Sequence, residues 1–179
     1  MARTSSGFCV WLTGLPCAGK TTIARELAPL LAARGLRVEL LDGDEVRQRL
    51  SPELGFDRAS REVHAGRVAY LAQVLARNGV VSIVALISPY ASSRARARKE
   101  IGRFAEVYVA TPVAVCEERD TKGLYRRARA GEIRGFTGVD DPYEAPESPE
   151  IRVETVGKSP VDCALEVLDG LDRLGFTSS

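Results

Sequence analysis

The 179-residue sequence predicts a three-layer α/β fold, in which a mostly parallel sheet carries helices on both faces. Three observations lead to this class. Short apolar segments alternate with longer segments of helical spacing along the whole chain. One apolar segment, residues 80–87, is rich in β-branched residues, as expected of a parallel strand that is buried on both faces. A loop bounded by glycines joins the first strand to the first helix.

Composition and turn residues delimit the elements in order. Segments of strand character occupy residues 8–12, 36–41, 80–87, 104–109 and 151–155. Segments of helical spacing occupy residues 22 to about 34, 45–50, 58–77, 91–101, 112–119, 122–130 and 160–174. Gly35 and Gly79 lie where a helix should stop, and Pro112 lies in the first turn of another. Residues 131–149 are rich in Gly, Pro and Asp, which predicts a mobile loop.

Length and charge limit the class of protein. The length suits one domain over residues 1–179, with flexible ends expected at residues 1–6 and 175–179. The net charge of +1 gives no reason to expect nucleic acid or an anionic membrane as the main partner. Because the sequence shows neither a membrane-spanning apolar stretch nor a signal peptide, we expect a cytoplasmic protein.

Two groups of side chains leave alternatives open. The cysteines are scattered without metal-site spacing: Cys9, Cys17, Cys116 and Cys163. In a reducing compartment we expect them to form no disulfides. Cys17 lies in the glycine-bounded loop, either as a small residue whose backbone matters or as a thiol of lowered pKa that is sensitive to oxidants. The arginines Arg94, Arg96, Arg98 and Arg103 form either a polyanion-binding patch or, as we favour, a solvated helix face.

The glycine-bounded loop fits the Walker A pattern G-x-x-x-x-G-K-[ST] in every position. It comprises Gly14, Leu15, Pro16, Cys17, Ala18, Gly19, Lys20 and Thr21, followed by Thr22. A strand, such a loop and a helix together turn backbone N–H groups onto a phosphate. Lys20 adds a positive charge near the outer phosphates, and Thr21 supplies a hydroxyl for Mg²⁺. Because both flanks fit, we interpret the loop as the phosphate site of a P-loop nucleoside-triphosphate-binding fold, rather than as a chance match.

Two carboxylates narrow the chemistry to phosphoryl transfer. A guanine-reading Asn-Lys-x-Asp segment is missing, which disfavours a GTPase, and the small size disfavours a motor. Asp42 and Asp44 follow a strand, so one can serve a metal-bound water and the other an acceptor hydroxyl. Gly43 between them allows a substrate to approach the backbone closely. The alternative is an aspartate that only caps the next helix.

Together these motifs resemble the adenylylsulfate kinase (APS kinase) family, P-loop kinases that phosphorylate the ribose 3′-hydroxyl of adenosine 5′-phosphosulfate. The similarity extends from about Phe8 to Thr155. It rests on residues 14–22, 41–44, 54–56, 87–90, 122–125, 129–133, 136–138 and 141–147. The stretches after residue 122 are long and unusual, so they discriminate far better than Walker A.

The resemblance implies a role for each matching position. Arg119 matches an arginine that packs on the ATP base, Asp44 is expected to orient or deprotonate the 3′-hydroxyl, and Asp42 is expected nearer the Mg²⁺ waters. The acceptor site would comprise two arginines for the phosphosulfate, Arg47 and Arg61, and two aromatic rings around the adenine, Phe56 and Phe136. Its remaining members would be Lys122, Ile87, Leu124, His64 and Ser88, the last a site-lining hydroxyl and a possible phosphorylated residue.

The family also implies a homodimer, a lid over residues 131–149 and a possible sulfurylase partner. The chain departs from the usual pattern at Pro16, Cys17 and Ala18, at His64 where asparagine is common, and at Gly66 and Gly135. His64 is either a donor to the substrate, as asparagine would be, or a partly buried helix histidine. We therefore expect a Mg²⁺-dependent kinase that converts ATP and adenosine 5′-phosphosulfate to ADP and 3′-phosphoadenosine 5′-phosphosulfate. A kinase of the same fold for another small hydroxyl compound and a non-catalytic nucleotide-binding domain are the alternatives.

Overall fold

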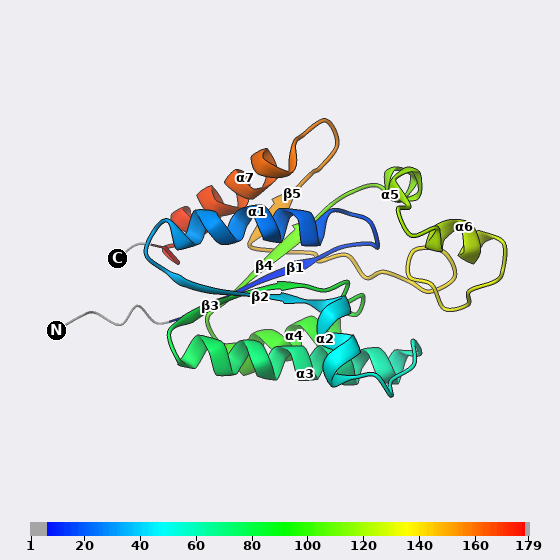
Figure 1. The fold of residues 1–179 in the computed structure, drawn as a ribbon, viewed down its shortest axis with the longest axis horizontal. Helices are drawn as coiled ribbons and strands as arrows, with labels where there is room; N and C mark the ends of the chain where they lie inside the picture. Colours follow the sequence, from blue (N-terminus) through cyan, green and yellow to red (C-terminus); the bar gives the residue numbers. More distant parts are fainter. Residues whose placement is uncertain (1–6, 178–179) are drawn as a thin grey trace.

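The computed structural model describes residues 7–177, which contain one five-stranded sheet in the order β2-β3-β1-β4-β5. The strands are β1 (Cys9–Thr13), β2 (Arg37–Asp42), β3 (Val80–Ala85), β4 (Phe104–Val109) and β5 (Ile151–Val153). Every neighbouring pair is parallel. Helices cover both faces of the sheet (Figure 1), so the predicted three-layer α/β class is confirmed.

The helices lie close to the predicted segments. They are α1 (Lys20–Ala32), α2 (Gly43–Leu50), α3 (Arg58–Arg77), α4 (Ala91–Ile101), α5 (Val113–Arg119), α6 (Leu124–Arg129) and α7 (Pro160–Arg173). Figure 1 places α1 and α7 on one face of the sheet and α2, α3 and α4 on the other. Side chains cap several starts: Asp57 accepts from the Ser60 N–H before α3, and Ser159 forms a capping box with Asp162 before α7.

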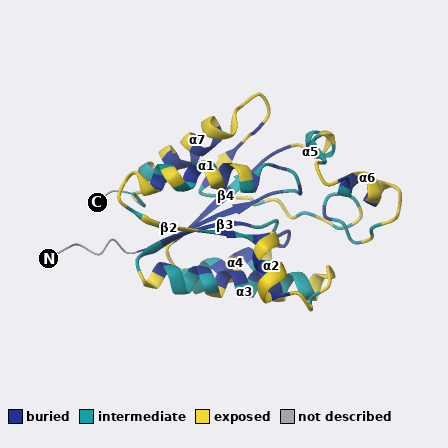
Figure 2. Ribbon diagram, viewed as in Figure 1, coloured by how far each residue is buried: buried dark blue, intermediate teal, exposed yellow. Residues whose placement is uncertain are grey.

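Alternating side chains of the strands build two apolar cores, one on each face. In β1, Val10 and Leu12 face α1 and α7, whereas Cys9 and Trp11 face α3 and α4. Figure 2 accordingly shows the inner strands as buried and the outer helix surfaces as exposed, while the edge strand β2 is only partly buried. A parallel sheet covered on both faces has this pattern. Both cores lie behind the carboxyl ends of the strands, which leaves those ends for a ligand site.

The structure corrects the predicted end of the third strand. The sequence predicts a strand over residues 80–87, but β3 ends at Ala85. The chain leaves the sheet because Ser88 adopts a left-handed backbone with φ of 41°, and because the Ile87 carbonyl accepts from the Thr13 hydroxyl at 2.6 Å. The last strand is likewise shorter than predicted, three residues in place of five.

The prediction that the arginines of the 94–103 region form a solvated face is wrong for Arg94. Its side chain is 4% exposed, and its Nε donates to Glu106 of β4 at 2.7 Å. Arg98 pairs with Glu106 and Glu150, while Arg96 is exposed. The sequence could not show this pairing, because Arg94 and Glu106 belong to different elements and meet only when α4 packs on the sheet.

The carboxyl end packs further along the chain than predicted. Phe176 lies against Phe8 with ring centroids 5.1 Å apart, and the Arg103 guanidinium lies over both rings. The packed chain therefore extends past residue 175, where a flexible end was expected; residues 1–6 and 178–179 lie outside the described range. No helix within residues 7–177 combines the length and the apolar composition needed to cross a bilayer.

Candidate active site

A cavity of about 810 Å³ opens at the carboxyl ends of the strands. Figure 1 shows α5, α6 and the first part of the 131–149 segment beyond this end of the sheet, while the rest of the segment runs back to β5. Every residue that we assigned to the acceptor contributes to the lining: Asp44, Arg47, Phe56, Arg61, His64, Ile87, Ser88, Lys122, Leu124 and Phe136. So do Asp42 and Arg119, together with Pro16, Cys17, Gly19, Lys20, Thr21 and Thr22 of the phosphate loop. Gly14, Leu15 and Ala18 of the predicted loop are not part of the lining.

The phosphate loop depends on backbone conformations that favour glycine. Gly14 and Gly19 have φ of 156° and 107°, and a side chain at Gly14 would lie 2.6 Å from the Val109 carbonyl oxygen. No side chain caps the start of α1, so its first N–H groups point toward the cavity. Lys20 donates from Nζ to the carbonyls of Gly14 at 2.9 Å and Leu15 at 2.7 Å. Burial lowers the pKa of the Lys20 ammonium to about 8.

Asp42 connects the phosphate loop to the start of α2. Its Oδ2 accepts from the Thr21 hydroxyl at 3.0 Å, and its Oδ1 accepts from the Asp44 N–H at 2.9 Å. The helix-cap alternative therefore applies to Asp42, which caps α2 and also faces the loop. The Thr21 hydroxyl and the Asp42 carboxylate provide adjacent hard oxygen ligands, a pair that fits Mg²⁺, which is commonly held by few protein oxygens together with phosphates and waters.

Asp44 lies in the first turn of α2 and forms an ion pair with Lys122, with Oδ2 and Nζ 2.7 Å apart. Both side chains are exposed, and the hydrogen bond to Asp44 raises the pKa of Lys122. The pair joins α2 to the segment that precedes α6. Sequence analysis placed both residues at the acceptor without pairing them, because they are 78 positions apart.

The two predicted adenine-binding rings line the same cavity but differ in their support. Phe56 is 66% exposed, and the Arg47 guanidinium lies 4.5 Å from its ring centroid. Phe136 is half-buried and meets the Tyr125 ring edge-on, with centroids 5.0 Å apart. The Tyr125 hydroxyl donates to the Pro16 carbonyl at 3.0 Å. Phe56 is therefore exposed beneath the Arg47 guanidinium, while Phe136 packs on Tyr125, which is hydrogen-bonded to the phosphate loop.

Arg61 connects α3 to the 131–149 segment. Its Nε donates to the Phe56 carbonyl at 2.6 Å. The rest of the guanidinium donates to the Gly135 carbonyl, the Thr137 hydroxyl and, at 3.3 Å, the Asp141 carboxylate. The far half of the segment is held separately, since Arg94 donates to the Glu144 carbonyl and the Tyr143 hydroxyl lies 2.9 Å from that of Thr13.

Ser88 and His64 line the cavity with their polar atoms already in hydrogen bonds. Ser88 is 3% exposed, and its Oγ accepts from Trp11 Nε1 at 3.0 Å. The two ring nitrogens of His64 lie 3.0 Å from the Ser51 hydroxyl and 3.1 Å from the Gly43 carbonyl. Both residues therefore take part in the protein's own scaffold at the cavity wall.

Some cavity residues were missed by sequence analysis. Arg119 at the end of α5 donates to the Thr155 hydroxyl at 2.9 Å, and Thr155 follows β5 beside the phosphate loop. Lys158 also lines the cavity. The sequence could have indicated Thr155 and Lys158, because both follow the last strand and ligands of parallel sheets bind at the carboxyl ends of the strands. Thr137 and Ile133 also line the cavity; they belong to stretches that match the family, but neither was given a role.

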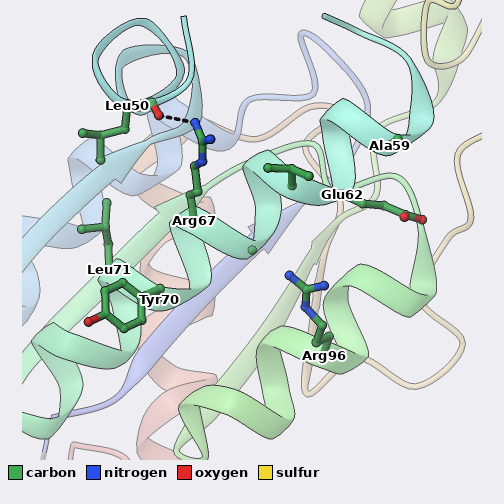
Figure 3. A pocket seen from close by; sticks show the side chains of 9 residues that line it. Leu50, Ala59, Glu62, Arg67, Tyr70, Leu71 and Arg96 are labelled. Carbon is green, nitrogen blue, oxygen red and sulfur yellow. Dashed lines mark hydrogen bonds between the residues drawn. The ribbon is translucent and has the colours of Figure 1, made fainter. Parts of the chain in front are cut away.

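A second hollow of about 680 Å³ lies between α3 and α4, apart from the phosphate loop (Figure 3). The exposed apolar side chains on its wall are Leu50, Val63 and Tyr70. A side chain at Gly66 would meet the Arg96 guanidinium at 2.1 Å, so Arg96 takes the space beside this glycine. Gly66, one of the departures from the expected pattern, is thus part of this hollow and not of the cavity.

One cavity holds a phosphate loop with its lysine, the adjacent Thr21 hydroxyl and Asp42 carboxylate, and a second, aromatic subsite. These features define a kinase of the P-loop class. The model of the adenylylsulphate kinase family matches residues 6–154. The chain belongs to this family, so the resemblance seen in the sequence is confirmed.

Individual relatives agree over nearly the full length. The adenylyl-sulfate kinase of Synechococcus sp. (strain JA-3-3Ab) is 52% identical over 170 residues, which cover 95% of this chain and 97% of the relative. The Mycobacterium tuberculosis APS kinase CysC, solved in complex with AMPPNP and APS, is 42% identical with a TM-score of 0.90, covering 93% of this chain and 98% of that one. A gluconokinase from Sinorhizobium meliloti 1021, at 20% identity and a TM-score of 0.63, shares the fold.

Proposed function

We propose that this protein is an adenylyl-sulfate kinase, which transfers the γ-phosphoryl group of ATP to the ribose 3′-hydroxyl of adenosine 5′-phosphosulfate. The products are ADP and 3′-phosphoadenosine 5′-phosphosulfate, an activated form of sulfate. One observation carries the proposal: the phosphate loop and the aromatic subsite share one cavity, with Asp44 among its lining. Membership of the family and the kinase relatives support the same reaction.

In this mechanism the chain contributes position and charge. The backbone N–H groups of the phosphate loop, which Pro16 lacks, would bind the triphosphate together with Lys20, and Arg119, which lines the cavity, would pack on the ATP base. Thr21 and Asp42 would hold Mg²⁺, which neutralises charge on the transferring phosphoryl group when it is bound. Phe56 and Phe136 would stack on the acceptor adenine, while Arg47 and Arg61 would face its phosphosulfate.

Asp44 would align the acceptor hydroxyl and accept its proton. Its carboxylate is exposed to the cavity, and Lys122 is the partner that would hold it in place before the acceptor binds. Closure of the 131–149 segment would exclude water, which otherwise competes with the acceptor hydroxyl for the phosphoryl group. Ser88 would act through its place in the wall, since direct transfer needs no phosphorylated enzyme.

The proposal includes a cytoplasmic homodimer, with neither nucleic acid nor membrane as a partner, and an association with a sulfurylase. A bifunctional SAT/APS kinase from Sorangium cellulosum, 48% identical, has a region similar to this chain over 29% of its length. A structural neighbour is a hexameric APS kinase from Thiobacillus denitrificans. Sedimentation equilibrium of the purified protein would test the dimer, and a single monomeric species at micromolar concentration would refute it.

Turnover of the purified protein with ATP, Mg²⁺ and adenosine 5′-phosphosulfate tests the reaction. We expect ADP and 3′-phosphoadenosine 5′-phosphosulfate in equal amounts, and strong loss of both in Asp44→Ala. Turnover with another hydroxyl compound but not with this acceptor would favour a related small-molecule kinase. Equal near-zero rates for the parent and Asp44→Ala, with ATP binding retained, would favour a non-catalytic domain.

A further inference from the structure

His64, the only histidine of the chain, lies on α3 and is 2% exposed. Its ring points at the start of α2, where Nε2 lies 3.1 Å from the Gly43 carbonyl oxygen. Its Nδ1 lies 3.0 Å from the Ser51 hydroxyl, just beyond the end of α2. The ring therefore contacts both ends of the short helix that carries Asp44.

The partners fix where the ring proton lies. A carbonyl oxygen only accepts, so Nε2 carries the hydrogen and donates it to Gly43. In the neutral ring Nδ1 then accepts, and the Ser51 hydroxyl donates to it. Arg67 completes the chain, because its Nη1 donates to the Ser51 oxygen at 3.3 Å. Every polar atom of the ring is thus engaged within the protein, and none is left for a substrate.

Charges around the ring favour its neutral form. Arg47 on α2 and Arg67 on α3 face it, opposed by Asp44 at the start of α2. In the 51–57 loop, Glu53 is paired with Arg67 at 2.6 Å. Burial is the main influence that lowers the pKa of His64, and the two arginines act in the same direction.

Gly43 is held from the opposite side as well. A side chain there would lie 2.6 Å from Leu86 Cδ1 and 3.0 Å from the Ala85 carbonyl oxygen, so its backbone packs directly on the end of β3. Arg67 also donates to the Leu50 carbonyl at the last residue of α2, as Figure 3 shows. Helix α2 is therefore clamped between β3 and α3, with His64 at its first residue and Arg67 at its last.

We propose that His64 is a positioning residue that fixes the Gly43 peptide, and with it the flanking carboxylates Asp42 and Asp44, rather than a ligand of the acceptor. The inference rests on the proposed function for the role of Asp44, although the hydrogen bonds stand without it. A peptide that is free to rotate would move both carboxylates, and small errors of alignment reduce the rate of the chemical step.

Two amide variants separate positioning from acceptor binding. In His64→Gln the amide nitrogen reaches as far as Nε2 and can still donate to Gly43, whereas in His64→Asn it is one bond too short. We expect His64→Gln to keep kcat within about threefold of the parent and His64→Asn to lose about tenfold, the equivalent of one hydrogen bond, with the acceptor KM little changed in both. The exposed Arg77→Gln on α3 is the matched control.

The opposite pattern would overturn the proposal. If His64 bound the acceptor, asparagine, which is common in the family at this position, would sustain activity, and glutamine would raise the acceptor KM at unchanged kcat. Ser51→Ala should lower kcat without changing the acceptor KM; a change in KM alone would count against positioning. Thermal unfolding of each variant identifies any that lose activity by failing to fold.

Nitrogen NMR of the isotope-labelled parent tests the hydrogen bonds without any activity. One histidine gives one imidazole pattern, and we expect the neutral ring with its proton on Nε2 at neutral pH. A proton on Nδ1, or a charged ring, would refute the assignment. If this pattern is found but the protein turns over no adenosine 5′-phosphosulfate, the proposed function fails while the scaffold role of His64 stands.

Discussion

Replacement of Phe56 by alanine should weaken acceptor binding with little effect on the fold. The ring is 66% exposed, and its described contact is the Arg47 guanidinium at 4.5 Å, an exposed cation–π pair of about 0.5–1 kcal/mol. Stacking on adenine contributes about 1–3 kcal/mol per base. Loss of that contact corresponds to about a 5- to 150-fold rise in the acceptor dissociation constant. Phe136→Ala should reduce stability as well, because its ring packs on Tyr125.

Calorimetric titration with adenosine 5′-phosphosulfate, in the presence of a non-hydrolysable ATP analogue, measures this loss. Phe56→Tyr keeps a ring and serves as the control, so its affinity should stay near that of the parent. ATP affinity should be unchanged in Phe56→Ala. The stacking argument would be refuted by an acceptor affinity within about twofold of the parent, or by an equal loss for ATP, which would indicate a general disturbance of the cavity.

Three further outcomes follow from the contacts. Asp44→Asn should lower kcat by about 10²- to 10⁴-fold in steady-state assays, whereas Lys122→Ala should lower it far less. Burial lowers the pKa of His64, so as the pH falls the unfolded chain takes up this proton before the folded protein does. At pH values below about 6.5 the free energy of unfolding should therefore decrease, by at most about 1.4 kcal/mol per pH unit. His64→Gln should lack this contribution. In urea, Arg94→Leu should cost about 3–5 kcal/mol, and Glu106→Leu added to it should restore only part of that loss, because the Ser88 and Glu144 carbonyls still lack their donor.

Local patterns were sufficient for the fold and for the position of the site. The phosphate loop and the boundaries of α3 could be predicted because glycines, caps and apolar spacing act over a few residues. The burial of Arg94 could not, since its partner Glu106 belongs to another element. The early end of β3 had the same cause: Ile87 and Ser88 leave the sheet to meet Thr13 and Trp11, which are more than 70 residues away in the sequence.

The site itself shows the same division more sharply. Family motifs name Arg61 as an anion-binding residue, and the structure places it at the cavity, yet its guanidinium donates to Gly135, Thr137 and Asp141. The hydrogen bonds to Phe56, Gly135, Thr137 and Asp141 use four of the five N–H donors of this planar group, so an anion that accepts two parallel hydrogen bonds would displace at least one of these partners. We therefore expect that an anion bound at Arg61 would shift the 131–149 segment, because both would depend on the same side chain. A sequence motif identifies which residues line such a site. Only the packed structure shows the protein groups to which these residues are hydrogen-bonded, and which a ligand would have to displace.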